Sequence, residues 1–486
     1  MIISSVHTDR TNQVLWKGES MNVTRRQFGL GLVGTGIALG VSACGGKLTT
    51  QSHSASAAMA SPLAATGVAR KYLLEAGPTK VDLGGKIVDT WTYGNSIPGK
   101  FLRATAGDRV QVAFTNNLPD ASSVHWHGLA IQNNMDGVPG LTTPETSSGE
   151  TFHFDFVIPN AGTHWFHPHT GVQMDRGLYA PFIVDDPREP GAYDHEWILI
   201  LDDWTDGIGP NPEQILAGLK AAGGGGSMSG TNMSGSSGAM NMGGMDGGDV
   251  NYPLYLINGK SPSDPDVLSA KPGQRVRLRI INASADTIFS VALDRHDMTV
   301  THTDGYAVEP MRTSAIKIGM GERYDATVTL NDGVFPLVAV PYGKSGIARA
   351  LIRTGGGGVP NASYTPKAMG STPLTVDSLR ASAGTALPSK KPDSTQELVL
   401  AGGMQPYKWT INGRTYDNTV PLTINQGDTG QVRITNQTMM PTRCICTVTH
   451  SNWGKPAAVD RVRTRYLCPP WAPSISHCSR TTRANG

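Results

Sequence analysis

One short pattern occurs three times along the chain and constrains its fold more than any other feature. Each copy starts at a glycine turn, ends at an asparagine and alternates apolar with polar residues, which indicates a half-buried β-strand. The three copies are Gly107–Asn116, Gly273–Asn282 and Gly427–Asn436. An Asn/Gly turn precedes each copy, at Gly94-Asn95, Asn258-Gly259 and Asn412-Gly413. A pattern repeated in this way predicts three sandwich domains of one kind.

The composition agrees with an all-β fold. Glycine (58 residues) and proline (32) are abundant and aromatic residues are scarce at 7%, which is typical of short strands joined by many turns. The net charge of +2 comes from nearly balanced signs, and the chain has no block of Lys and Arg. We therefore expect no nucleic-acid partner.

The repeats and the low-complexity stretches between them place the domain boundaries. The last domain is short by several strands for its class, so we expect it to be incomplete. The expected segments are a flexible stretch over 46–69, domains over 70–188, 189–354 and 396–486, and a Gly/Pro/Ser/Thr/Lys-rich linker over 355–395.

A Gly/Ser-rich stretch, residues 223–248, interrupts the second domain. It lacks the apolar bulk to pack a core, so we expect a mobile loop. Thioether sulfur suits cuprous ion, so its methionines are candidate copper ligands; the alternative is a simple flexible insertion. These methionines are Met228, Met233, Met240, Met242 and Met245.

Residues 1–45 are typical of an export signal. A twin-arginine pattern, Thr24-Arg25-Arg26-Gln27-Phe28, precedes a weakly apolar stretch that is too short to span a bilayer comfortably. The tetrapeptide 41–44, ending in Cys44, resembles the lipobox of bacterial lipoproteins. We therefore expect export by the twin-arginine machinery and a lipid anchor at Cys44 on the periplasmic side of the cell envelope. The alternatives are a plain cleaved signal and a start at Met21 instead of Met1.

Two closely spaced histidine pairs are the strongest sign of chemistry. His125 and His127 flank a tryptophan, and His167 and His169 flank a proline. Residues i and i+2 of a strand point to the same face, so each pair can reach one site. Two pairs on neighbouring strands would deliver four imidazoles into one cavity, whereas His164 falls on the opposite face. Imidazole binds copper, zinc, iron or nickel, so the ligand type alone does not select the metal.

The motif His125-Trp-His-Gly128, followed by Asp136-Gly137 and then by His167-Pro-His169, resembles the first-domain signature of multicopper oxidases. The resemblance extends over residues 70–441, and is strongest to the bacterial laccase-like and copper-resistance types. It implies three cupredoxin-like Greek-key β-sandwiches and copper as the cofactor, with four ions in an intact member.

The same resemblance implies a role for each residue of the motif. His125 would bind a type 2 copper, and His127, His167 and His169 would bind the type 3 pair. Asp136 matches an acidic position that passes protons towards bound oxygen; the alternative is a turn-capping aspartate before a glycine. The implied function is oxidation of a small reductant (cuprous or ferrous ion, or a phenol) with reduction of dioxygen to water, serving copper tolerance.

The C-terminal region departs from this family. Members supply the remaining ligands through an H-P-x-H-x-H segment and a later H-C-H-x-x-x-H segment, and neither occurs here. Codons can be chosen for residues 442–453 such that a reading frame shifted one base upstream, with a codon for Pro441 that ends in C, encodes HPMHLHGHTFQL. This string contains the missing H-P-x-H-x-H segment. Apart from Cys44, every cysteine follows this point: Cys444, Cys446, Cys468 and Cys478. We therefore expect residues 442–486 to be out of frame, after loss of one nucleotide near codon 441.

A chain with this C-terminus keeps only half of the histidines of the family's three-copper cluster and none of its blue-copper ligands. We therefore expect the chain as written to be inactive as an oxidase. An alternative function is non-enzymatic copper binding or buffering in the cell envelope. A copper-free protein with an interaction role is a third class, which the two histidine pairs argue against.

Overall fold

The computed structural model describes four long ranges, a set of short strands and a few further residues. These are 65–189, 193–223, 247–386 and 391–418, with 420, 422 and 429–438, and the strands 2–3, 442–446, 450–453, 462–463, 465–468 and 473–479. The export signal, Cys44 and the five methionines of the Gly/Ser-rich stretch lie outside the described residues. The described chain consists mainly of strands, which confirms the predicted all-β class.

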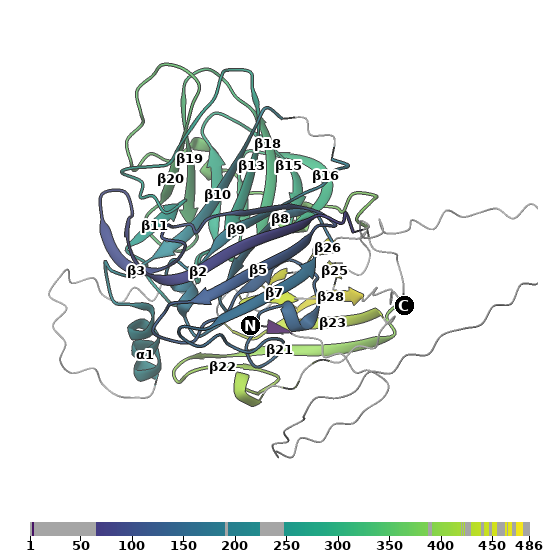
Figure 1. Cartoon of the computed structure of the whole chain (residues 1–486). Helices are drawn as coiled ribbons and strands as arrows, with labels where there is room; N and C mark the ends of the chain where they lie inside the picture. The colour runs from purple at the N-terminus through teal and green to yellow at the C-terminus, as the bar shows by residue number, and fades with distance from the viewer. Residues whose placement is uncertain are drawn as a thin grey trace, which may run out of the picture. The chain divides into compact units, whose positions relative to one another are not determined.

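The first sandwich consists of two four-stranded sheets (Figure 1). One sheet contains, in spatial order, β3 (Ile87–Tyr93), β2 (Ala69–Asp82), β5 (Arg109–Asn116) and β7 (Thr151–Val157). The other contains β4 (Leu102–Thr105), β9 (Ala180–Asp185), β8 (Gly162–His167) and β6 (His125–His127). Phe114 and Phe154 from one sheet and Phe166 and Phe182 from the other share a single core, which holds the two sheets face to face.

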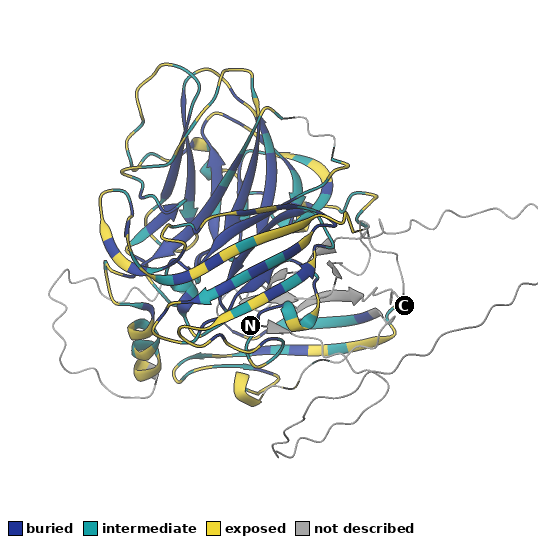
Figure 2. Ribbon diagram, in the orientation of Figure 1, coloured by how far each residue is buried: buried dark blue, intermediate teal, exposed yellow. Residues whose placement is uncertain are grey.

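The second sandwich is larger. Its six-stranded sheet contains β11 (Leu254–Ile257), β10 (His195–Trp204), β13 (Arg275–Asn282), β18 (Arg323–Thr329), β15 (Met298–Thr303) and β16 (Tyr306–Thr313). The five-stranded sheet contains β12 (Val267–Ser269), β20 (Ala348–Arg353), β19 (Val334–Pro341), β14 (Phe289–Leu293) and β17 (Ile316–Ile318). Leu278, Phe289 and Leu337 lie in the core between them, and Figure 2 shows the central strands of this sandwich as largely buried.

Residues beyond 391, together with Ile2 and Ile3, form two further sheets. A six-stranded sheet contains β22 (Tyr407–Ile411), β21 (Ser394–Met404), β23 (Thr429–Asn436), β28 (Pro473–Ser479), β25 (His450–Trp453) and β26 (Val462–Arg463). A three-stranded sheet contains β1 (Ile2–Ile3), β24 (Thr442–Cys446) and β27 (Arg465–Cys468). Among the described side chains, the core of this region is formed by Leu398, Leu400, Ile411 and Ile434.

The repeated pattern forms the equivalent strand in each of three sheets. β5, β13 and β23 each pair in parallel with an earlier strand (β2, β10 and β21) and antiparallel with a later one (β7, β18 and β28). The closing asparagine of each copy is fully buried, and its side-chain oxygen accepts a hydrogen bond from the backbone N–H two residues later. These asparagines are Asn116, Asn282 and Asn436. The repeat therefore encodes both a strand and the turn that ends it.

A few helices connect the strands. They are α1 (Pro212–Gly223) and the 3₁₀ segments η1 (Asn133–Met135), η2 (Gln173–Asp175), η4 (Lys367–Gly370), η5 (Val376–Ser378) and η6 (Tyr416–Asn418). None of the helices in the described ranges has the length and apolar character that crossing a membrane requires. Part of the segment predicted as a linker packs on the second sandwich, because Leu374 and Leu379 are buried in its core.

A buried ionic network joins the first two sandwiches. Asp325 on β18 accepts hydrogen bonds from Arg277 at 2.7 Å and Arg279 at 2.9 Å, both on β13, and from the Thr163 hydroxyl on β8 at 2.6 Å. Burial alone would raise the pKa of Asp325, but the two guanidinium groups outweigh it and hold that pKa well below its usual range. A polar side chain of the first sandwich, Thr163, therefore forms a buried hydrogen bond with Asp325 of the second.

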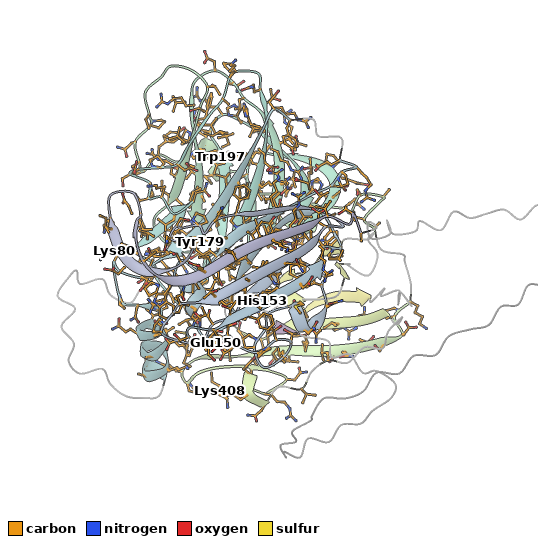
Figure 3. The ribbon with its side chains drawn as sticks, viewed as in Figure 1. Lys80, Glu150, His153, Tyr179, Trp197 and Lys408 are labelled. Carbon is orange, nitrogen blue, oxygen red and sulfur yellow. The ribbon has the colours of Figure 1, made fainter. Side chains whose placement is uncertain are left out.

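Side chains elsewhere follow the usual division between core and surface, as Figure 3 illustrates. Tyr179 and Trp197 are buried, whereas Lys80 near the end of β2 is exposed. The Tyr179 hydroxyl donates to Asp202 at 2.7 Å, so even this buried polar group is hydrogen-bonded.

Candidate metal centre

Strand β6 separates its histidines from its tryptophan. Trp126 points into the first core, where its ring lies 5.2 Å from Phe154 and 5.4 Å from Phe166 between centroids. His125 and His127 therefore point to the opposite face of the strand. β6 pairs antiparallel with β8, and the register places His125 opposite His167. The alternation of a short strand thus directs both predicted pairs to one region.

The four predicted imidazoles lie together. The ring centroid of His125 is 5.5 Å from that of His127, 5.6 Å from that of His167 and 4.6 Å from that of His169. His167 lies 5.1 Å from His127 and 5.0 Å from His169 by the same measure. Two sequence-distant pairs, 125–127 and 167–169, therefore form one cluster, which we call the histidine cluster.

The loop after β6 orients His125. The Nδ1 of His125 lies 2.7 Å from the backbone oxygen of Asp136, so Nδ1 carries the proton and Nε2 keeps its lone pair. Gly137 makes this approach possible: its φ is +81°, and a Cβ there would lie 1.7 Å from the carbonyl oxygen of Val124. The Asp136-Gly137 turn is thus pressed against the start of the strand that carries the histidines.

His127 and His167 are hydrogen-bonded to each other. Nδ1 of His127 lies 2.8 Å from Nε2 of His167, and Nδ1 of His167 lies 2.9 Å from the backbone oxygen of Pro168. Because a neutral His167 that donates from Nδ1 must accept at Nε2, His127 donates from Nδ1 and its Nε2 keeps a lone pair. Trp165 stacks on both rings, with centroid distances of 4.7 Å to His127 and 4.2 Å to His167.

Ser123 positions the second pair. Its hydroxyl oxygen accepts a hydrogen bond from the backbone N–H of His169 at 2.8 Å, and its carbonyl accepts one from the Tyr93 hydroxyl at 3.2 Å. Burial lowers the pKa of His169 well below its usual value, and the neighbouring rings of His125 and His167 add to the effect. A neutral imidazole is the form that binds a metal ion.

The cluster fits copper in ligand type and in its unsatisfied atoms. Nε2 of His125 and Nε2 of His127 are buried without a hydrogen-bond partner, which is costly unless a ligand is bound there. Within the described ranges, however, no three His, Cys, Asp or Glu side chains form a group that could hold one ion. Nδ1 of His127 and Nε2 of His167 are joined by a hydrogen bond instead. Two of the imidazoles therefore each present an unused nitrogen that a metal ion can bind.

Asp136 lies beside the histidine cluster. Its side chain is 1% exposed, and neither carboxylate oxygen has a hydrogen-bond partner. Its Oδ1 is 3.4 Å from Nδ1 of His125. A buried carboxyl group without a hydrogen-bond partner in the described ranges thus lies next to His125. His164, in contrast, lies away from the cluster, against Gly128 and Gly305.

Sequence reasoning missed Ser123, Tyr93 and Trp165. Trp165 could have been found, because it lies two residues before His167 and so shares its face of β8. Ser123 contacts the loop that follows β8 and Tyr93 contacts Ser123, and nothing local in the sequence signals either contact.

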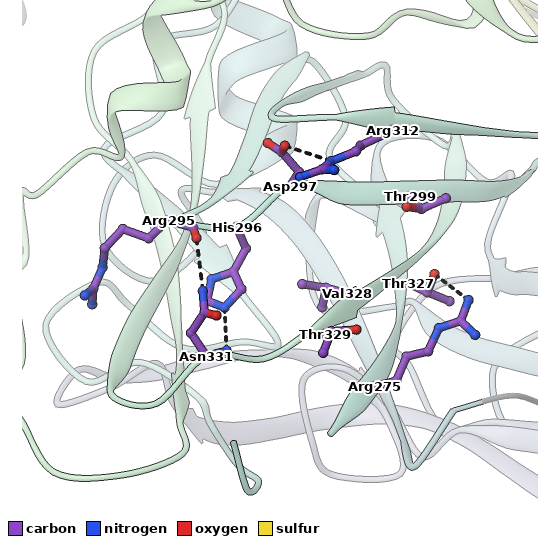
Figure 4. Close-up of a pocket in the computed structure, with 10 residues that line it drawn as sticks. All are labelled: Arg275, Arg295, His296, Asp297, Thr299, Arg312, Thr327, Val328, Thr329 and Asn331. Atoms are coloured by element: carbon purple, nitrogen blue, oxygen red, sulfur yellow. Dashed lines mark hydrogen bonds and ion pairs between the residues drawn. The ribbon is translucent and has the colours of Figure 1, made fainter. Parts of the chain in front are cut away.

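A separate polar pocket of about 450 Å³ lies on the second sandwich (Figure 4). Two of its three arginines are already ion-paired, Arg312 with Asp297 at 2.9 Å and Arg295 with Asp294 at 3.1 Å. The lining residues are Arg275, Arg295, His296, Asp297, Thr299, Arg312, Thr327, Val328, Thr329 and Asn331. With most of its positive charge neutralised, we assign this pocket no part in the metal chemistry.

Comparisons with known proteins agree with the geometry. Two family models, both described as multicopper oxidase, match residues 75–189 and 195–357. Multicopper oxidase MmcO of Mycobacterium tuberculosis is 46% identical over 429 residues, which cover 86% of this chain and 84% of that protein. Copper resistance protein A of Escherichia coli is 32% identical over 355 residues, which cover 69% of this chain and 57% of that protein.

Solved structures show the same fold. Fet3p, described as a multicopper oxidase that functions in iron import, superposes with a TM-score of 0.70 at 17% identity, covering 84% of this chain and 85% of that chain. The laccase of Botrytis aclada superposes with a TM-score of 0.69 at 20% identity, covering 85% of this chain and 83% of that chain. At this level of identity the likeness concerns the fold alone.

Proposed function

Because the chain belongs to the multicopper oxidase family, we propose that the histidine cluster is one half of the copper site at which such an oxidase reduces dioxygen. His125 would hold one copper, and His127, His167 and His169 would hold a pair. Copper cycles by single electrons, so several bound ions store the four electrons that dioxygen needs to become water. The observation that carries the proposal is the convergence of four imidazoles, with Nε2 of His125 and of His127 unsatisfied.

The proposed reductant is small: cuprous ion, ferrous ion or a phenol, with copper tolerance as the biological role. A relative named for copper resistance supports this choice. Oxygen uptake should be measured with each reductant in turn, on a protein whose reading frame after codon 441 has been restored. Turnover with none of the three would reject the proposed substrates.

We propose Asp136 as the group that passes protons to the copper site. Its buried carboxyl has no hydrogen-bond partner and lies beside His125, which supports this role. In the frame-restored protein, Asp136→Asn should slow oxygen reduction while leaving the copper content unchanged. Loss of copper together with activity would instead assign Asp136 to the structure of the site.

The chain as written should lack oxidase activity, because the remaining copper ligands of the family do not occur in its last domain. We attribute this to loss of one nucleotide near codon 441, which places 442–486 out of frame. Sequencing the gene through this codon tests the cause. Purified protein of the present sequence tests the consequence: it should be colourless and consume no oxygen with phenols or cuprous ion.

The second candidate is a copper-binding protein of the cell envelope without oxidase activity. The intact histidine cluster supports copper binding independently of the last domain, and the methionines of 223–248 add candidate sites for cuprous ion. Titration with cuprous ion, with and without residues 223–248, separates the two sets. Unchanged cuprous binding after the deletion would exclude the methionines.

We also propose that residues 1–45 direct twin-arginine export and that Cys44 carries a lipid anchor, leaving domains at 70–188, 189–354 and 396–486. The twin arginines support export and the lipobox-like tetrapeptide supports the lipid anchor. The three equivalent sheets support the division into three domains. Replacing Cys44 by Ser should release the protein from membranes, whereas replacing both arginines by lysine should retain it inside the cell.

A further inference from the structure

Arg323 of the second sandwich reaches into the first sandwich next to Gly128, the residue that follows His127. Its side chain is fully buried, and its Nε donates to the backbone oxygen of Thr163 on β8 at 2.9 Å. Nη1 donates to Asp304 at 3.1 Å, which holds the guanidinium from the side of the second sandwich. A fully buried arginine is costly, so its position calls for a specific explanation.

The guanidinium lies at the end of the paired strands that carry the histidines. β6 and β8 pair as far as His127 opposite Trp165, and one further step of the same antiparallel register sets Gly128 opposite His164. A Cβ on Gly128 would lie 2.2 Å from Nη2 of Arg323 and 2.9 Å from Nδ1 of His164. Arg323 therefore packs against both strands at the point where their pairing ends.

The backbones of the two sandwiches also approach each other closely near Arg323. Gly162, the first residue of β8, faces Gly305 so closely that a Cβ on Gly162 would lie 2.6 Å from the Cα of Gly305. A Cβ on Gly305 would in turn lie 2.9 Å from the ring of His164. The backbones of the two sandwiches are thus in direct contact at the start of β8.

We propose that Arg323 is a positioning residue for copper binding, which fixes β6 against β8 and so sets the spacing between the histidine pairs. The inference rests on the proposed function, because it takes the histidine cluster as the copper ligands. The planar guanidinium donates to β8 through Nε and packs Nη2, which has no hydrogen-bond partner among the described residues, against Gly128, whereas an ammonium group would contact only one of the two strands.

The test compares Arg323→Met and Arg323→Lys with Arg349→Met in the chain as written. Arg349 is a matched control: it is also buried in the second sandwich, but it donates to the backbone of Pro360 and Asn361 instead of reaching the first sandwich. Cupric ion alone is titrated, with affinity and the electron paramagnetic resonance spectrum as readouts, alongside thermal unfolding of each apoprotein.

Arg323→Met should weaken cupric binding by about 10- to 100-fold, the usual effect of removing a group that orients metal ligands. It should also change the copper spectrum. Arg349→Met should lower the unfolding temperature without changing affinity or spectrum, and Arg323→Lys should fall between wild type and Arg323→Met. If Arg323→Met does not fold, Arg323→Lys and Asp304→Asn, which removes the partner of Nη1, carry the test.

Two outcomes are distinguishable failures. Unchanged copper affinity and spectrum in folded Arg323 variants would overturn the positioning role and leave the copper site standing. No cupric binding by the wild-type histidine cluster would reject the proposed function itself, and the positioning role with it.

Discussion

His125 donates from Nδ1 to the backbone oxygen of Asp136 at 2.7 Å, and this single contact decides which of its nitrogens is available to a metal. The main-chain oxygen of Asp136 thus favours the tautomer that carries the proton on Nδ1. A turn that lies eleven residues away in sequence thereby orients one histidine of the proposed metal centre.

Gly137→Ala should disturb both stability and copper binding. The new methyl group would meet the carbonyl of Val124 at 1.7 Å in a backbone with φ of +81°, so the turn must move away from His125. We expect a loss of about 3 kcal/mol or more in the free energy of unfolding, with weaker cupric binding. Gly140→Ala is the control, because its φ is +73° and its Cβ would meet nothing within 4 Å. Equal effects of the two changes in urea unfolding would contradict this account.

Asp325→Asn should be strongly destabilising. The change removes one of two carboxylates from each of Arg277 and Arg279, which remain buried with Glu189 and Glu196 as their other partners, and we expect it to cost about 3 kcal/mol. Asp155→Asn is the control, because its partner Arg109 is largely exposed and an exposed ion pair contributes little to stability. Urea unfolding of both variants at neutral pH provides the comparison.

The free energy of unfolding should decrease on acidification because His164 is protonated more readily in the unfolded chain. Burial, with the charge of Arg323, lowers the pKa of this ring from 6.5 to about 3. The unfolded chain therefore binds a proton that the folded chain refuses, so the contribution is complete above pH 6.5 and declines as pH falls towards 3. His164→Gln should reduce the dependence in this window by at most about 1.4 kcal/mol per pH unit. Parallel curves for wild type and variant would show that His164 does not titrate in this way.

Replacing single histidines should separate the cluster from the surface. His167→Ala removes a ring that contacts the other three, so bound copper and its resonance signal should both decrease. His153→Ala is the control, because this histidine is exposed on β7, where Figure 3 labels it. A similar decrease in both variants would indicate adventitious binding to surface imidazoles.

The sequence predicted those parts of the molecule that depend on local periodicity. The alternation within 107–116, 273–282 and 427–436 located three equivalent strands, and the spacing of His125 and His127 located one face of β6. In both cases the information lies within one strand, where side chains alternate with a period of two.

Contacts between distant segments could not be predicted in the same way. Thr163 and Asp325 meet across 162 residues, and neither shows a local pattern that names its partner. Nothing in the sequence around Arg323 distinguishes it from other polar residues. Its position beside Gly128 results from the packing of two sandwiches. The burial of Leu374 within a Gly/Pro-rich stretch is a further case, because composition averages over the few residues that pack.

The stacking of Trp165 on His127 and His167, at 4.7 and 4.2 Å, also gives the molecule an optical reporter. Paramagnetic cupric ion quenches the fluorescence of an indole in van der Waals contact with its ligands, and more distant tryptophans far less. Tryptophan emission should therefore decrease as the histidine cluster is occupied, without an added label.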